Sequence, residues 1–153
     1  MTRVLIAFNT VHDNTKRVAE LIAQGMKEGG VRDVTVVDME KTDPRQAVGF
    51  DVILLGCPNH ARRPTRAFSK FVDGMKKSGL TGKQIAVFDT YMEGQFQVVM
   101  GKMEKQVAEK LSSSTLVSPG LSTKVLGMKG PLADGEDAKC VSFGSNLSTR
   151  IGR

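Results

Sequence analysis

Tryptophan is missing from this chain of 153 residues, which contains one tyrosine and two histidines. With so few aromatic rings and no recognisable RNA- or DNA-binding motif, we expect no nucleic-acid partner. The net charge is nevertheless +6, and the basic residues are spread along the chain, as on a solvated surface. This net positive charge attracts acidic partners at long range, but it does not identify a particular partner.

Cysteine is also scarce, because the chain has only Cys57 and Cys140. They form no C-x-x-C pair and have no cluster of histidines near them in sequence. We therefore expect two reduced thiols and no metal site.

Long hydrophobic runs are lacking as well. The longest apolar stretches, such as Val4–Phe8, are far shorter than the roughly 20 residues that span a bilayer, and no apolar signal region follows Met1. We expect no integral membrane segment and a cytoplasmic location. The length suits a single domain, residues 1–153, with one compact core.

What the chain does contain is a set of short, continuous apolar runs bounded by polar or turn residues. Such runs are typical of strands buried on both faces of a parallel sheet. A fifth strand is expected within Thr115–Val125, and the first four are Val4–Phe8, Val34–Val37, Val52–Gly56 and Ile85–Phe88.

Between these runs the apolar period becomes helical. One helix should run from Thr15 to Gly29, a second should follow Pro64, and a third should lie between Gln95 and Ser112. Residues 38–49 could hold a further short helix, and a last helix should follow Pro131 and end near Ile151. Alternating strands and helices with right-handed crossovers predict an α/β fold, a doubly wound, five-stranded parallel sheet with helices on both faces.

Ligands of such sheets bind beyond the carboxyl ends of the strands. Three loops lie there: 9–15, 57–63 and 89–94. The first leads directly into a helix, so its backbone N–H groups, its short hydroxyls and the helix dipole could hold a phosphate. Asn and Thr at this place could also simply cap the helix.

These loops make the chain resemble the flavodoxin family along essentially its whole length. The family's phosphate loop reads [ST]-x-T-G-x-T, which Thr10, Asn14 and Thr15 match, while His12 replaces a usual threonine and Asp13 a usual glycine. Residues 56–60 look like the family's second flavin loop and residues 89–91 like its third. The tail 127–136 is similar to the segment that introduces the family's final helix.

The resemblance implies a bound flavin mononucleotide (FMN), with its phosphate on the first loop and its ring between the other two. Tyr91 is then the strongest stacking candidate and His60 a smaller cover on the other side. The Asp13 carboxylate would repel the phosphate unless His12, Lys16, Arg17 or the helix dipole offsets it. The cofactor-binding residues predicted in this way are Asn9, Thr10, Val11, His12, Asp13, Asn14, Thr15, Pro58, Asn59, His60, Ala61, Asp89, Thr90, Tyr91 and Gly94.

For function, the resemblance implies an electron-transfer protein in which the flavin carries out the redox chemistry and no side chain is catalytic. Its partners would be redox proteins, acidic ones in view of the basic charge, and Arg62, Arg63 and Arg66 could form a docking patch. The protein would be a monomer or a homodimer. If it is an enzyme, it would be an FMN-dependent quinone or NAD(P)H-linked reductase.

Other interpretations stay open at this stage. A flavodoxin-like interaction module without cofactor is one. A second is a cysteine phosphatase or arsenate reductase, because Cys57 and Arg63 have C-x5-R spacing, although Pro58 and Pro64 argue against it. A response-regulator receiver would need an aspartate where Cys57 stands, and a dinucleotide-binding domain would need G-x-G-x-x-G.

Overall fold

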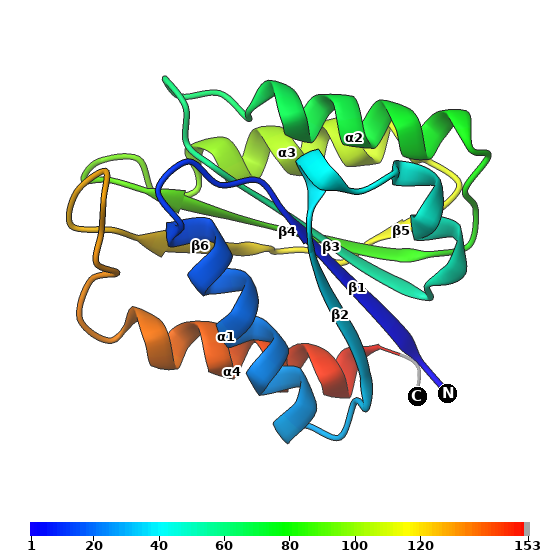
Figure 1. The fold of residues 1–153 in the computed structure, drawn as a ribbon, viewed down its shortest axis with the longest axis horizontal. Coiled ribbons are helices and arrows are strands. Elements are labelled where there is room, and N and C mark those ends of the chain that lie inside the picture. The colour runs from blue at the N-terminus through cyan, green and yellow to red at the C-terminus, as the bar shows by residue number, and fades with distance from the viewer. Residues whose placement is uncertain (152–153) are drawn as a thin grey trace.

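The computed structural model describes residues 1–151 and contains one twisted parallel sheet between two layers of helices (Figure 1). The strands lie in the order β2-β1-β3-β4-β5. The short strand β5 pairs with the start of β4, and β6 pairs with the end of β4. The predicted doubly wound α/β fold is confirmed. The strands are β1 (Arg3–Phe8), β2 (Asp33–Asp38), β3 (Val52–Pro58), β4 (Gln84–Tyr91), β5 (Thr115–Leu116) and β6 (Leu121–Lys124).

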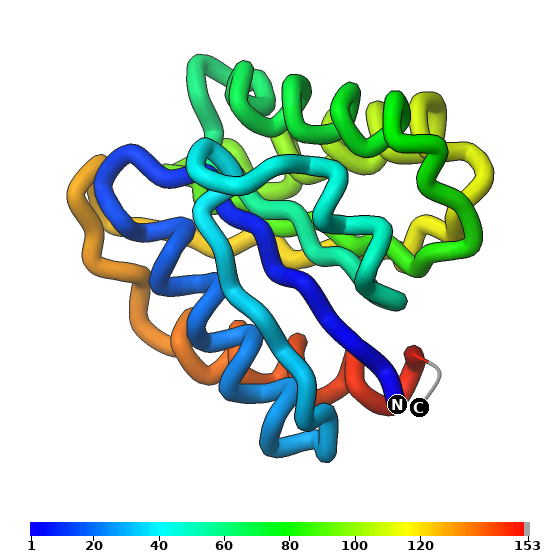
Figure 2. Tube along the Cα trace, turned by 45° about the vertical axis from the view of Figure 1, so that its right-hand side comes forward, coloured from blue at the N-terminus to red at the C-terminus, as the bar shows by residue number. Residues whose placement is uncertain are grey.

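Both faces of the sheet are buried, which explains the continuous apolar runs. In β1, Leu5 and Ala7 face one apolar cluster while Val4, Ile6 and Phe8 face the other. The first cluster is covered by α2 (Arg66–Lys77) and α3 (Val98–Lys110), and the second by α1 (Asn14–Glu28) and α4 (Glu136–Arg150). Figure 2 shows the two helical layers on opposite sides of the strands.

Two expectations need revision. The fifth strand is broken into β5 and β6, because Pro119 has no N–H to give to the ladder and the Gly120 N–H donates instead to the Glu104 side chain, 2.9 Å away. The segment 38–49 forms two short 3₁₀ helices, Met39–Lys41 and Pro44–Gly49, in place of one helix. Each is capped by the aspartate before it, Asp38 and Asp43.

Helices α1 and α4 cross at very short range on a pair of glycines. A Cβ placed on Gly144 would lie 2.1 Å from the Ile22 carbonyl oxygen, and one on Gly25 would lie 1.9 Å from that of Val141. Neither position can therefore carry a side chain without separating the helices. This contact fixes the axis of α1, the helix that begins at the predicted phosphate loop.

Candidate flavin site

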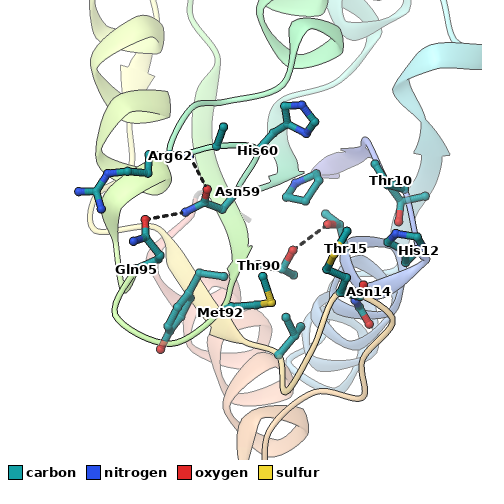
Figure 3. Close-up of a pocket in the computed structure, with 16 residues that line it drawn as sticks. Thr10, His12, Asn14, Thr15, Asn59, His60, Arg62, Thr90, Met92 and Gln95 are labelled. Carbon is teal, nitrogen blue, oxygen red and sulfur yellow. Dashed lines mark hydrogen bonds between the residues drawn. The ribbon is translucent and has the colours of Figure 1, made fainter.

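A pocket of about 370 Å³ opens at the carboxyl ends of β1, β3 and β4. This is the volume of a small-molecule site, at the sheet edge where ligands of this architecture bind. Its lining is mostly apolar and comes from four segments, which bring together Thr10, Val11, His12, Asn14, Thr15, Pro58, Asn59, His60, Ala61, Arg62, Thr90, Tyr91, Met92, Gln95, Val125 and Met128. Figure 3 shows Thr10, His12, Asn14 and Thr15 on one side of the pocket and Asn59, His60, Arg62 and Gln95 across from them.

The first loop ends in an unusual helix start. Asp13 is the N-cap of α1 and has φ 65°, in the left-handed region, and its side chain makes no cap hydrogen bond. That conformation explains why glycine is usual here and why an aspartate, which tolerates it better than most residues, can replace it. The first turn of α1 contains no acidic side chain, so its N–H groups and helix dipole present positive potential.

Thr10 is the polar group that points most directly to a ligand. Its Oγ1 is buried and has no hydrogen-bond partner among the described residues, a state that costs free energy unless something binds there. Thr15, by contrast, shares a buried hydrogen bond of 3.1 Å with Thr90, which joins the start of α1 to the end of β4.

A fourth segment closes the pocket beside α1. The Asn14 side-chain amide donates to the carbonyl oxygen of Met128 at 2.9 Å, and a Cβ on Gly130, which has φ +88°, would lie 2.5 Å from Asn14 Oδ1. Glycine is therefore required at position 130 for this turn to lie against the phosphate loop. Val125 and Met128 enter the lining through this segment.

The second loop is a two-residue hairpin turn. His60 and Arg63 exchange backbone hydrogen bonds of 3.1 and 3.0 Å, and Ala61 and Arg62 between them have φ 53° and 68°. Positive φ at both central residues is the requirement of a type I′ turn, which Asn-Gly meets far more readily than Ala-Arg. The turn is held by the Asn59 side chain, which accepts from the Arg62 N–H at 2.8 Å, and by Lys102, whose ammonium donates to the Arg62 carbonyl at 2.5 Å.

In the third loop the single tyrosine is nearly covered. Tyr91 is 9% exposed, and the ring of Phe96 meets it edge to face at a centroid distance of 5.6 Å. Burial raises the pKa of the Tyr91 phenol, with the Glu136 carboxylate adding to the effect. The phenol therefore stays neutral at physiological pH, and Tyr91 presents an apolar wall to the pocket.

Four predicted site residues lie outside the lining: Asn9, Asp13, Asp89 and Gly94. Asn9 is buried and donates from its side chain to Glu40 at 2.7 Å, while Asp13 and Gly94 are exposed with positive φ. Asp89 is fully buried, and its two oxygens accept from Ser122 Oγ at 2.6 Å and from the Met100 N–H at 2.9 Å. Burial raises its pKa to about 6.

The lining contains five residues that were not among the predicted cofactor-binding residues: Arg62, Met92, Gln95, Val125 and Met128. Gln95 carries a signal that could have been found, because it follows directly after the predicted third loop. Its amide oxygen accepts from the Asn59 side chain at 3.3 Å, on the same side of the pocket. Arg62 and Met92 adjoin predicted residues of the second and third loops, and Val125 and Met128 come from the segment before the final helix. The resemblance placed that segment in the chain but not beside the site.

Residues 5–128, which include every residue that lines this pocket, match the family model of the flavodoxin domain. The chain belongs to the flavodoxin family. It is 25% identical over 137 residues to the flavodoxin of Clostridium beijerinckii, covering 88% of this chain and 91% of that one. The family resemblance read from the three loops is confirmed.

Solved flavodoxins have the same fold. Oxidised flavodoxin 1 of Bacillus cereus superposes with a TM-score of 0.81 at 22% identity, covering 99% of this chain and 100% of that one. A flavodoxin from the domain Archaea gives 0.81 at 19% identity, covering 97% of this chain and 98% of that one.

For this flavodoxin-family chain, the environment of Cys57 argues against the cysteine-phosphatase alternative. Cys57 is fully buried, its Sγ lies 3.7 Å from the sulfur of Met103, and burial raises the pKa of its thiol to about 12. A nucleophilic cysteine must instead be a partly exposed thiolate.

The residues present also fit the family's flavin. The unpaired Thr10 hydroxyl and the first turn of α1, which follows the Asp13 N-cap and contains no acidic side chain, suit a phosphate, and Tyr91 beside a largely apolar pocket suits an aromatic ring. Among the described residues, no helix has the length and apolar character needed to cross a membrane.

Proposed function

We propose that this protein binds FMN and carries electrons between redox partner proteins. Family membership supports the function, and the buried, unpaired Thr10 hydroxyl in the loop before α1 is the observation that carries the choice of a phosphate-bearing flavin. Bound FMN would supply one- and two-electron chemistry.

The chain's own residues would hold and shield that group. Thr10 and the first N–H groups of α1 would bind the phosphate, and Thr15 is committed to Thr90 as a support for this loop. Tyr91 and the hairpin at His60 would flank the ring from opposite loops. Because the pocket walls are mostly apolar, they would exclude water from the ring.

The surface around the pocket suits an acidic protein partner. Several exposed apolar side chains lie at the pocket or next to its lining residues in sequence. Val11, Met92 and Met128 line the pocket, and Phe96 and Leu126 directly follow the lining residues Gln95 and Val125. Arg62 lines the pocket, Arg63 follows it in the hairpin turn, and Arg66 lines a separate groove that also contains Glu40. Within residues 1–151 none of these three arginines forms an ion pair. An apolar centre with an unpaired basic rim is complementary to an acidic docking face.

We place this electron transfer in the cytoplasm, a reducing compartment in which the unpaired Cys57 and Cys140 would remain thiols.

The test is a titration of the purified protein with FMN, followed by flavin fluorescence. We expect quenching and a stable yellow complex, and a Thr10→Val variant should bind several-fold more weakly because it lacks the hydroxyl. A protein that stays colourless and leaves FMN fluorescence unchanged contradicts the proposal and favours a cofactor-free interaction module.

Partner choice is tested with the flavin-loaded protein. Reduction by an acidic [2Fe–2S] ferredoxin should be fast at low salt and slower in a double Arg62→Glu, Arg63→Glu variant, whereas exchange with a basic c-type cytochrome should not slow. Equal rates for the variant and the parent with ferredoxin would refute the acidic-partner assignment. Rapid quinone reduction driven by a nicotinamide would instead favour a reductase.

A further inference from the structure

Both histidines of the chain, His12 and His60, line the same pocket. His12 belongs to the phosphate loop and His60 to the hairpin opposite, and Figure 3 shows them on the two sides of the pocket. Among the described lining residues, His12, His60 and Arg62 can carry positive charge, and of these only His12 comes from the phosphate loop. Within this lining, the loop that would hold the phosphate therefore contributes one side chain that can carry a positive charge, His12.

The other basic groups near the start of α1 are used elsewhere. Arg17 pairs with Asp137 at 3.1 Å, and both side chains are more than half exposed. Lys16 lines a different groove, between α1 and β2, together with Glu20 and Asp38. Neither side chain belongs to the lining of the flavin pocket.

Acidic side chains near the phosphate loop would oppose the binding of an anion. Asp13 lies next to His12, is exposed and makes no cap hydrogen bond, and Glu40 lies beneath the loop, where it accepts from Asn9. From the other segments around the pocket come Lys129, which is exposed, and Glu93, which is paired with Lys124. Asp13 lies outside the pocket lining but belongs to the loop that would hold the phosphate, and no ion pair of its carboxylate occurs among the described residues. Repulsion between this carboxylate and a phosphate dianion bound at the loop weakens binding.

We propose that His12, in its protonated form, pairs with the FMN phosphate and offsets Asp13, so that the protein's affinity for FMN falls as pH rises through neutrality. This inference rests on the proposed FMN binding. A histidine side chain gains and loses its proton near neutral pH, and a neighbouring phosphate dianion favours the protonated form. Binding of FMN is then accompanied by proton uptake.

The experiment compares FMN with riboflavin, which has the same ring and no phosphate, between pH 6.5 and 8.5. In this range free FMN is already mostly a dianion, because a phosphate monoester has its second pKa near 6, and its remaining ionisation would strengthen binding as pH rises. We expect the dissociation constant for FMN to increase about fivefold from pH 6.5 to 8.5, as for one partly exposed charge pair. The constant for riboflavin should not change.

Two variants assign the effect. His12→Thr, which restores the residue usual in the family, should bind FMN with no decrease in affinity over this range. His60→Gln removes the other histidine of the same pocket and should keep the decrease, whatever its effect on absolute affinity. Calorimetry of FMN binding in two buffers with different ionisation enthalpies should show proton uptake near pH 7.5 in the parent and none in His12→Thr.

The outcomes separate the two proposals. A protein that binds neither flavin overturns FMN binding itself. If FMN binds but its affinity does not depend on pH, if riboflavin shows the same dependence, or if His12→Thr retains it, the role of His12 is wrong while the flavin site stands.

Discussion

The Asp89 carboxylate accepts a hydrogen bond of 2.9 Å from the backbone N–H of Met100, and so a residue of β4 caps the first turn of α3. The helix has no cap of its own, because Gln97 at the N-cap is left-handed and makes no side-chain cap bond. Ser122 completes the arrangement by donating to Asp89 at 2.6 Å and accepting from the Gln97 N–H at 3.0 Å. The carboxylate therefore fixes α3 to the strands that carry the third flavin loop.

Replacing Asp89 with asparagine should flatten the dependence of stability on pH. Burial raises the pKa of Asp89 from 3.8 to about 6, so the folded state binds its proton more tightly than the unfolded state does. Below about pH 4 this group contributes about 3 kcal/mol to the free energy of unfolding, and this contribution is lost as pH rises to about 6. Urea unfolding at several pH values should show that the difference in stability between the parent and Asp89→Asn changes over this interval. The exposed Asp134→Asn is the control, and it should follow the parent.

Gly144→Ala and Gly101→Ala should have opposite effects, although both glycines lie within helices. A methyl group on Gly144 would meet the Ile22 carbonyl oxygen at 2.1 Å, whereas one on Gly101 meets nothing within 4 Å. We expect Gly144→Ala to destabilise the fold by about 3 kcal/mol and Gly101→Ala to stabilise it by about 1 kcal/mol. Thermal and urea unfolding measure both, and similar effects of the two variants would contradict the close crossing of α1 and α4.

Ala61→Gly should stabilise the protein by about 1 kcal/mol, because Ala61 has φ 53° in the hairpin turn and glycine adopts this region without strain. The matched control is Ala67→Gly within α2, which should cost a similar amount. Stabilities from urea unfolding decide the matter. Destabilisation by Ala61→Gly would show that the left-handed turn is not the solution conformation.

Asp13→Asn should strengthen FMN binding about threefold and leave riboflavin binding unchanged, since it removes a charge next to the phosphate while keeping a residue that tolerates φ 65°. Asp13→Gly should add a gain in stability of about 1 kcal/mol in the absence of flavin. Weaker FMN binding by Asp13→Asn would mean that the carboxylate supports the site.

Neither cysteine should react with an aromatic disulfide reagent in the folded protein. Cys57 and Cys140 are both buried, and burial raises the pKa of their thiols to about 12 and about 11, which suppresses the reactive thiolate. In denaturant both should react.

Hydrolysis of an aryl phosphate by the protein should be undetectable. Turnover that is present in the parent and disappears in Cys57→Ser would revive the phosphatase alternative.

The sequence was most informative where burial is uniform. Val4–Phe8 and Ile85–Phe88 lie in strands with apolar layers on both sides, and an unbroken apolar run leaves few other structures. Phe68, Phe71, Val72 and Met75 are all buried on one side of α2, as their spacing predicts.

Local sequence could not show which polar group at a strand end faces the pocket. Asp89 and Thr90 are neighbours in β4, yet Thr90 lines the pocket while Asp89 binds the N-terminus of α3. Nor could it place Met128, because the position of its loop depends on a hydrogen bond with Asn14, 114 residues earlier in the chain. These features depend on which elements meet in space.

That long-range hydrogen bond also bears on how the protein acquires its ligand. Because residues from both ends of the chain shape the pocket, a partly folded chain would not present it, and only the native state would capture the flavin. Ligand and folding are then linked by mass action, and free flavin at 100 times its dissociation constant would add about 2.7 kcal/mol to the stability. The melting temperature should therefore rise with flavin concentration, which makes heat resistance a direct measure of cofactor supply.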